Sequence, residues 1–294
     1  MAIASLTLVA CLFLPRLPLN VEILVTGSLI VFLGVPHGAL DTLYLRKVIG
    51  IESKLKLVLM LAGYLTISAA IVLLWMVSPL LFLLGFLAAS SFHFSGDPEV
   101  GASLATRMAV GIGVVTLPGI YHAEELRQLY SLLTNPSVAS SVVSLSVPIA
   151  YCVCVVAAVA LIIETFKKRY THASELIIIV LLSTLAPPLL AFTVYFCLMH
   201  SARHILRTAK IVDTARGAFI FECCLPMVGV LLAGACAWKF RSASSLDAKV
   251  VQILFVTLAA LTAPHMVIVE PVRFRGWSPV GTATRTREVH IPQS

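Results

Sequence analysis

The chain has 294 residues, of which 59% are hydrophobic and only 12% are charged. Soluble domains carry about 25% charged residues, so this composition excludes an ordinary soluble protein and favours an integral membrane protein built of helices. The formal net charge of +7 comes from short basic clusters between apolar runs. That arrangement is the positive-inside pattern of membrane proteins, and it does not indicate a nucleic-acid-binding protein.

Apolar segments follow one another along the chain, and most approach the length of about 20 residues that crosses a bilayer as a helix. These segments cover residues 2–14, 20–45, 54–77, 79–95, 102–120, 138–164, 174–186, 188–207, 217–238 and 247–269. Their links are short, so we expect one transmembrane catalytic domain over residues 1–270 and a basic cytoplasmic tail over 271–294. The predicted fold is an all-α polytopic membrane helix bundle with about 8–10 transmembrane helices.

Two points in this series need an interpretation. Residues 2–14 lack the basic n-region and the cleavage site of a signal peptide, so we interpret them as a short first span. Pro187 and Pro188 predict either a tight turn between two spans or a kink in one long helix. The links before and after residues 174–207 are both basic. They would lie on opposite sides of the membrane if this stretch were one span, which favours the turn.

The charges of the links predict the orientation. Basic residues mark four segments as cytoplasmic: 46–56, 167–169, 207–216 and 273–287. The link 121–137 carries Glu124 and Glu125 and is expected outside, with an amphipathic surface turn at 123–133. The link 239–249 fits poorly, because it is basic and this topology places it outside. The pattern predicts a multi-pass protein of the cell membrane with both termini in the cytoplasm.

Histidines recur at one depth in this topology. The spans that begin at residues 20, 79, 188 and 247 run in the same direction, and each carries histidine in its later half. The residues concerned are His37, His93, His200, His204 and His265. Ionisable side chains inside a membrane are costly, and histidines with unrelated packing roles would not be expected to align. The other three histidines, His122, His172 and His290, fall in links or the tail and are expected to be solvated.

The most compact motif is the pair His200 and His204. Residues four apart share one face of a helix, so two such imidazoles can bind one metal ion. The pair alone also fits two rings that only form hydrogen bonds to neighbouring helices. Arg203 lies between them on another face, and we expect it either to reach the cytoplasmic interface or to pair with a carboxylate such as Asp41 or Asp97.

The other histidines lie in motifs with neighbouring carboxylates. Pro36 interrupts the helix next to His37, and Asp41 lies one turn further on, where it can accept the second ring N–H of a metal-binding histidine. A kinked helix with a solvated Asp41 is the alternative. In Ser90–Asp97, the serines offer hydroxyls to His93, and a capping or turn role is expected for the aspartate. His265 follows a proline, as His37 does, and is either a fifth ligand or a support for the ligands.

Imidazoles without cysteine suit Fe(II), Zn, Cu or Ni by ligand type. Structural zinc sites are closed and often contain cysteine, whereas the seven cysteines here lie in or beside apolar runs without CxxC spacing. We therefore expect the cysteines to pack as small hydrophobic residues. The surroundings of the histidines are apolar and aromatic, which predicts a lipid-soluble substrate that arrives from the bilayer.

Four of these motifs, in this order, resemble the Brp/Blh family of β-carotene 15,15′-dioxygenases. They are Pro-His-Gly-Ala-Leu-Asp, Ser-Phe-His-Phe-x-Gly-Asp, His-Ser-x-Arg-His and the late Pro-His-Met, between about Gly34 and Glu270. The resemblance implies cleavage of β-carotene by O₂ to two molecules of all-trans-retinal. It implies one Fe(II) ion held by His37, His93, His200 and His204, and it leaves open whether His265 is a ligand. It also implies a functional link to a retinal-binding rhodopsin.

Three other classes of protein remain as alternatives. A di-iron membrane oxidase would require about eight histidines in several boxes, and this chain has one HxxxH and no adjacent pair. A membrane metal or proton transporter can also use histidines within its spans. A carotenoid-binding or retinal-binding accessory protein would bind without turnover. No lysine lies in the middle of a span, so a rhodopsin-type Schiff base is not expected.

Overall fold

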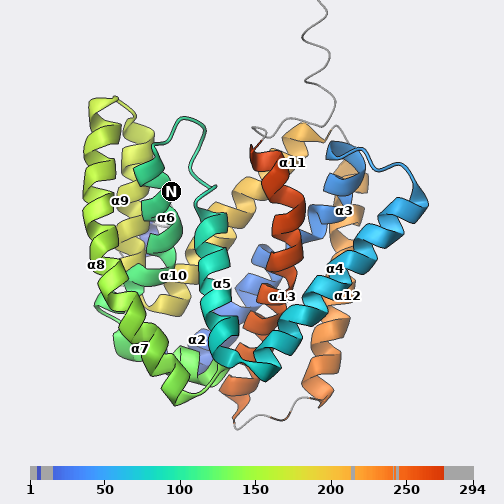
Figure 1. The fold of residues 1–294 in the computed structure, drawn as a ribbon, viewed down its shortest axis with the longest axis horizontal. Coiled ribbons are helices and arrows are strands. Elements are labelled where there is room, and N and C mark those ends of the chain that lie inside the picture. Colours follow the sequence, from blue (N-terminus) through green and yellow to red (C-terminus); the bar gives the residue numbers. More distant parts are fainter. Residues whose placement is uncertain (1–4, 8–15, 213–215, 241, 243–244, 275–294) are drawn as a thin grey trace, which may run out of the picture.

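Helices make up nearly all of the chain that the computed structural model describes, namely residues 5–7, 16–212, 216–240, 242 and 245–274. No strand occurs among these residues, so the predicted all-α class is confirmed (Figure 1). The expected first span at 2–14 lies outside the described residues except for 5–7. The last helix continues past the expected domain boundary to Phe274, and the rest of the expected tail lies outside the described residues.

The helices begin and end close to the apolar segments of the sequence, because each segment is bounded by proline, polar or charged residues. The longer elements are α2 (Leu19–Leu29), α4 (Lys54–Val77), α5 (Pro79–Phe94), α6 (Leu104–Thr116), α7 (Ala123–Leu133), α8 (Pro136–Phe166), α9 (Tyr170–Leu185), α11 (Ala202–Ile211), α12 (Arg216–Phe240) and α13 (Leu246–Phe274). Helix α6 continues into η4 (Leu117–Ile120), and α7 is the amphipathic segment expected at 123–133.

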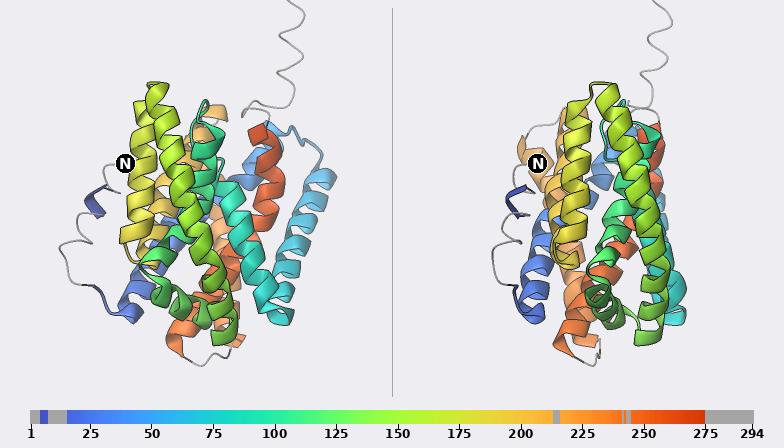
Figure 2. Two further views of the ribbon diagram at one scale, coloured as in Figure 1. Left: turned by 60° about the vertical axis from the view of Figure 1, so that its left-hand side comes forward. Right: turned by 90° about the vertical axis from the view of Figure 1, so that its left-hand side faces the viewer.

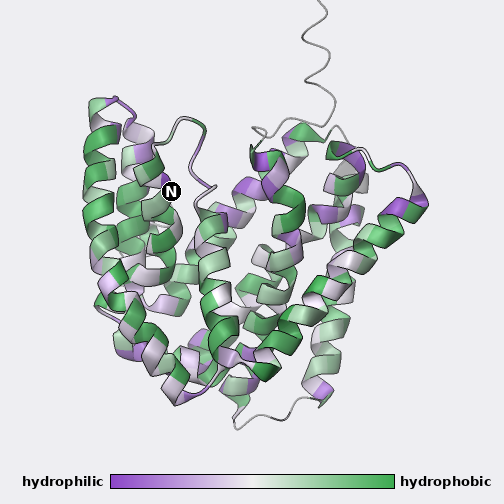
Figure 3. Ribbon diagram, viewed as in Figure 1, coloured by the Kyte–Doolittle hydropathy of each residue, from purple (hydrophilic) through white to green (hydrophobic). Residues whose placement is uncertain are grey.

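Six helical segments in the described part of the chain are long and apolar enough to cross a membrane. They are Leu19–Val48, Lys54–Val77, Pro136–Phe166, Pro188–Ile211, Phe219–Phe240 and Leu246–Phe274. A seventh candidate is the bent pair Leu104–Ile120 and Ala123–Leu133, and Pro79–Phe94 and Tyr170–Leu185 are shorter apolar helices. None of the residues of α4 is buried, and most residues of the outer helices are hydrophobic (Figure 3). The chain is therefore a multi-pass membrane protein.

Pro187 and Pro188 separate two helices. Helix α9 ends at Leu185, the backbone is extended at Ala186 and Pro187, and α10 (Pro188–Val194) begins at the second proline. Proline at the first helical position needs no hydrogen-bond acceptor for its missing N–H. Of the two interpretations of this point, the structure therefore has the turn rather than the kink.

The histidine-bearing helices run side by side in one direction. Helices α2, α5, α10 with its continuation α11, and α13 all run from the end of the bundle where α7 lies towards the opposite end (Figures 1 and 2). The basic links after residues 45, 166 and 206 lie at that opposite end, which agrees with the charge pattern of the sequence. The parallel direction brings the later halves of these helices to one level.

Two of these helices change their winding where they carry histidine. After α2 the chain passes through a π-helical turn η1 (Ile30–Gly34), a 3-10 segment η2 (Val35–Leu40), α3 (Asp41–Leu43) and a second π turn η3 (Tyr44–Val48). Pro36 lies at the start of η2 and cannot donate to the helical ladder, which accounts for the change there. Between α10 and α11 lies a further π segment, η5 (Tyr195–Ser201), which contains His200. Such π turns are frequent at functional sites.

Two histidines expected in solvent are buried, and that expectation was wrong. His122 is 4% exposed and contacts the Glu125 carboxylate and the Leu185 carbonyl. His172 is 8% exposed and lies 3.5 Å from the carboxylate of Glu164. The cause is that the links of this bundle are short and fold onto the helix ends, so a histidine at a predicted link is covered by its neighbours. His290 lies outside the described residues.

Candidate metal centre

The five histidines predicted to share one depth form a single cluster. The ring centre of His37 lies 4.9 Å from that of His200, 5.6 Å from that of His204 and 5.1 Å from that of His265. His93 completes the group, with its ring centre 4.7 Å from His200 and 5.2 Å from His265. All five side chains are buried, with exposed fractions between 2% and 7%. Four separate helical segments therefore bring their imidazoles to one point.

Ring nitrogens of three histidines in this cluster lie close enough together to share a metal ion. One nitrogen from each of His37, His93 and His265 lies within 4.8 Å of the other two. The Nε2 atoms of His93, His200 and His265 are buried and have no hydrogen-bond partner within the described chain. A buried polar atom without a partner costs about 1–3 kcal/mol, and several such atoms facing one another are best explained by a shared ligand. The donor set fits a transition-metal ion.

Three of the rings are held by a carboxylate on the other nitrogen. The Nδ1 atom of His93 donates to Glu270 at 2.8 Å, that of His200 to Asp97 at 2.9 Å, and that of His265 to Asp41 at 2.7 Å. A carboxylate accepts only, so the proton lies on Nδ1 and the lone pair lies on Nε2. This pairing is the usual support of a metal-binding histidine, because it fixes the tautomer and the ring orientation.

His37 is held by the backbone instead. Its Nδ1 atom donates to the carbonyl oxygen of Gly34 at 2.5 Å and lies 3.0 Å from the hydroxyl of Ser201. Gly34 is required at this point, because a Cβ atom there would collide with the ring of Phe196. That ring stacks on His200 at 5.6 Å and meets the edge of His37 at 5.3 Å. The glycine therefore allows the aromatic wall of the site to form.

The HxxxH pair divides between two elements. His200 belongs to the π segment η5, and His204 belongs to α11, with its ring stacked on Tyr44 at 5.5 Å. Both rings reach the cluster, His204 through ring contacts with His37 and His265. The pair therefore lies in one cluster with the other histidines, and its binding of a metal ion stays a prediction.

The carboxylates pair across helices. Asp41 is buried rather than solvated and accepts the second ring N–H of a clustered histidine, as the sequence suggested; that histidine is His265. Arg203 was expected either to reach the cytoplasmic interface or to pair with a carboxylate such as Asp41 or Asp97; it pairs with a carboxylate, that of Glu175, and approaches the carbonyl oxygen of Asp97 at 3.4 Å. Each pair joins different helices, so spacing within one helix does not predict it.

Asp97 is more than the turn residue that the sequence indicated. Its carboxylate accepts from His200 and also from the hydroxyl of Tyr195 at 2.5 Å, and its carbonyl accepts from Arg207 at 3.0 Å. Burial alone would raise the pKa of Asp97, but His200, the hydroxyl of Tyr195 and the charge of Arg203 together hold that pKa below its usual value. Asp97 is thus a charged acceptor fixed from several sides.

Glu270 holds the ring of His93, a role that the sequence did not predict. Its carboxylate binds His93 and also the guanidinium of Arg273 at 2.6 Å, one turn further along α13. Arg273 in turn donates to the carbonyl of His93 at 3.2 Å. The signal that could have identified Glu270 is its position: a carboxylate in an apolar span, near the level of the histidines, requires a partner.

A small cavity adjoins the cluster. Three of the histidines line it together with aromatic and aliphatic side chains. Its lining consists of His37, Phe86, Ser90, His93, Phe94, Phe192, Phe196, His200, Leu258 and Thr262. Most of these neighbours are apolar, so a molecule bound here would meet the metal ligands in a water-poor environment. The arrangement suits metal-assisted chemistry on an apolar substrate.

The chain is similar to proteins of one enzyme family over most of its length. The family model described as β-carotene 15,15′-dioxygenase matches residues 28–272, a range that contains all five clustered histidines. The β-carotene 15,15′-dioxygenase of the uncultured marine bacterium 66A03 is 33% identical over 262 residues, which cover 83% of this chain and 91% of that protein. No solved structure matches the chain. The family resemblance inferred from the histidine motifs is confirmed.

Proposed function

The chain belongs to the β-carotene 15,15′-dioxygenase family, and from that premise we propose that it cleaves the central double bond of β-carotene with O₂. In this reaction the 15,15′ carbon–carbon double bond breaks and each carbon gains one oxygen atom, giving two molecules of all-trans-retinal. The chain is thus an oxidoreductase, a carotenoid dioxygenase. The observation that carries the proposal is the cluster of five buried imidazoles beside an apolar cavity in a membrane helix bundle.

We propose that His37, His93, His200 and His204 hold one Fe(II) ion. The ion would activate O₂, which does not react readily by itself with a hydrocarbon whose electrons are all paired. His265 joins them as a further ligand in this proposal. Two features support its inclusion: its Nε2 atom is buried without a partner in the described chain, and its Nδ1 atom is held by Asp41. Asp41, Asp97 and Glu270 then serve as positioning residues, because each keeps a ring proton away from the metal side.

The protein around the metal keeps water out and the polyene in place. The rings of Phe94 and Phe196 pack against His200 at centre distances of 5.0 and 5.6 Å, so the site has an aromatic wall. A conjugated hydrocarbon offers no hydrogen-bonding groups, and only shape and apolar contact can orient it. β-Carotene dissolves in the membrane and would enter from the lipid, which agrees with apolar side chains on the outer helices.

The location and partners follow from the same proposal. We place the protein in the cell membrane with its termini in the cytoplasm, because the basic links gather at the end of the bundle opposite α7. Membrane lipid and the two substrates are its expected partners, with no nucleic acid among them. Retinal is a membrane-soluble aldehyde, so a retinal-binding rhodopsin is the kind of protein that would consume the product.

Expression in a host that accumulates β-carotene tests this function. We expect loss of the orange colour, appearance of retinal by chromatography, and about one iron per purified chain. Substitution of His37, His93, His200 or His204 by alanine should abolish retinal formation in a protein that still inserts. Persistent colour with a correctly inserted wild-type chain would contradict the function, and two irons per chain would favour a di-iron oxidase instead.

A further inference from the structure

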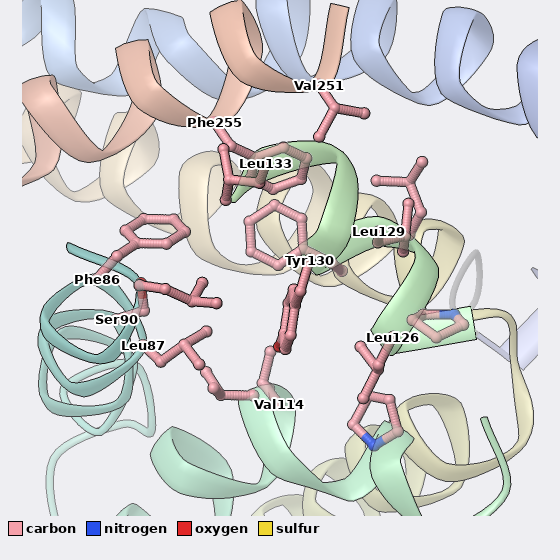
Figure 4. A pocket seen from close by; sticks show the side chains of 16 residues that line it. Phe86, Leu87, Ser90, Val114, Leu126, Leu129, Tyr130, Leu133, Val251 and Phe255 are labelled. Atoms are coloured by element: carbon pink, nitrogen blue, oxygen red, sulfur yellow. The ribbon is translucent and has the colours of Figure 1, made fainter. Parts of the chain in front are cut away.

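A larger cavity adjoins the small one beside the histidines. The two share Phe86, Ser90 and Phe192 as lining residues, so they meet at this point. The larger cavity has a volume of about 80 Å³. Its full lining is Leu83, Phe86, Leu87, Ser90, Val114, Val115, Pro118, Leu126, Leu129, Tyr130, Leu133, Pro188, Leu189, Phe192, Val251 and Phe255 (Figure 4). Ser90 and Tyr130 alone contribute side-chain polar atoms to this lining.

Three helices line both the metal centre and this cavity with one face. On α5 the residues Ser90, Leu87 and Leu83 precede His93 at helical spacing. Ten residues of helix separate Leu83 from His93, which is a distance of about 15 Å. The cavity is therefore a continuation of the metal site along the helix axis, away from the histidines.

The other two helices repeat this pattern. On the segment from α10 to η5, Phe192 and Leu189 precede His200. On α13, Phe255 and Val251 precede His265. In each case the lining residues are three, four, seven or more positions apart, which is the period of one helix face. Three parallel stripes of apolar side chains thus lead from the metal centre to the end of the bundle where α7 lies.

Helix α7 closes the far end of the cavity. It contributes Leu126, Leu129, Tyr130 and Leu133, and in the close view Tyr130 projects among Leu87 and Val114 (Figure 4). Its end is held in place by two side chains from other helices. Trp75 of α4 donates to the carbonyl of Leu133 at 3.0 Å, and Gln252 of α13 donates to the carbonyl of residue 132 at 2.8 Å. The end wall is therefore fixed relative to α13.

We propose that this cavity, the ring pocket, binds one half of the carotenoid, with the terminal cyclohexene ring against α7 and the polyene running to the metal centre. This inference rests on the proposed function and adds the way in which the cleaved bond is chosen. A rod-like substrate whose end meets a fixed wall presents one bond at a fixed distance from that wall. Because the two halves of β-carotene are identical, a single pocket of the right depth is enough to select the central bond.

A substrate with one ring makes this proposal testable, and β-apo-8′-carotenal is such a probe. The substitution Val251→Phe fills the far part of the ring pocket, so the ring should stop nearer the metal. The ring-bearing product should then be shorter than retinal. Tyr130→Ala deepens the pocket, and its ring-bearing product should be longer than retinal. Mass spectrometry of the products measures both shifts.

Matched controls use the same substitutions outside the pocket. Val267→Phe lies on the same helix as Val251, at a position with 61% exposure, and Tyr151→Ala lies on α8 with 57% exposure. Both controls should give retinal as their ring-bearing product, with the ring-free dialdehyde as the other fragment. If Tyr130→Ala also gives only retinal as its ring-bearing product, at the rate of its control, the ring pocket is not where the ring binds, whatever Val251→Phe does. A wild-type chain that forms no retinal at all would contradict the proposed function itself, so the two failures are distinguishable.

Binding can be measured apart from turnover. The variant His37→Ala is expected to bind β-carotene without cleaving it, and co-purified carotenoid can be quantified by its absorbance. Adding Val251→Phe to this variant should lower the bound carotenoid at least several-fold, whereas adding Val267→Phe should leave it unchanged. Equal carotenoid in the two double variants would overturn the proposal.

Discussion

Helices α5, α10 with η5, and α13 each have one inward face that is polar at one end and apolar at the other. At one end each helix presents a buried histidine, and at the other end the residues that line the cavity are leucine, phenylalanine, valine and proline, with Ser90 of α5 as the polar exception. At the polar end, one carboxylate from another segment of the chain accepts a hydrogen bond from each of His93, His200 and His265 and so orients the ring. The apolar end is specified by volume and shape. Changes at the polar end should therefore lower iron binding, and changes at the apolar end should lower activity in part while iron stays bound.

The largest effect is expected where a ring of the polar end is removed. His200→Ala should lose both retinal formation and bound iron, because the substitution removes a metal-binding nitrogen and leaves an empty space in its place. Leu189→Ala, on the other end of the same segment, should keep its iron and lose activity only partly. Iron analysis and retinal yield on the two purified variants measure the contrast. His172→Ala serves as a control for the loss of a buried histidine outside the cluster. An His200→Ala variant that keeps one iron would remove this residue from the ligand set.

The next effect concerns the pair of His265 and Asp41. Loss of a carboxylate that supports a metal-binding histidine typically lowers metal affinity about 10- to 100-fold. We expect Asp41→Asn to weaken iron binding to this extent, and His265→Ala to weaken it further. The double variant should match His265→Ala alone, because Asp41 acts only through the ring that it holds. Metal titration gives all three affinities. Additive losses would show that Asp41 acts independently of His265, and normal affinity in His265→Ala would show that His265 does not bind the metal.

The sequence predicts the framework of this site better than its details. Hydrophobic segments and proline positions predict the helix bounds, and the charge pattern predicts which helices run in parallel. From that, the convergence of five histidines follows. The carboxylate partners do not follow, because Asp41 and His265 are separated by 224 residues and Asp97 and His200 by 103. Such pairs depend on the rotation of each helix about its axis, which apolar helices that are hydrophobic on nearly every face do not encode.

A smaller effect tests how tightly the aromatic wall joins the two ends. Gly34→Ala should destabilise the protein by about 1–3 kcal/mol, because the added methyl group collides with the ring of Phe196 and forces repacking. Activity should fall as well, since that ring stacks on His200. Gly38→Ala is the matched control four residues on, where a Cβ atom meets nothing within 4 Å. Thermal unfolding in detergent compares the two. Equal stability of both variants would mean that the wall adapts without cost.

The smallest effect is expected for the serines next to His93, whose hydroxyls the sequence offered as its partners. The hydroxyl of Ser91 donates to the carbonyl of Leu87 at 2.8 Å, and that of Ser95 donates to the carbonyl of Phe92 at 2.6 Å. Both therefore satisfy the backbone of their own helix, while His93 is held by Glu270 from α13. Ser91→Ala and Ser95→Ala should each change stability by less than about 0.5 kcal/mol and leave iron affinity as it is. Glu270→Gln in the same assay should weaken iron binding about 10- to 100-fold. A serine variant that loses as much iron affinity as Glu270→Gln would show that the polar end is built from residues near in sequence rather than from pairs between distant helices.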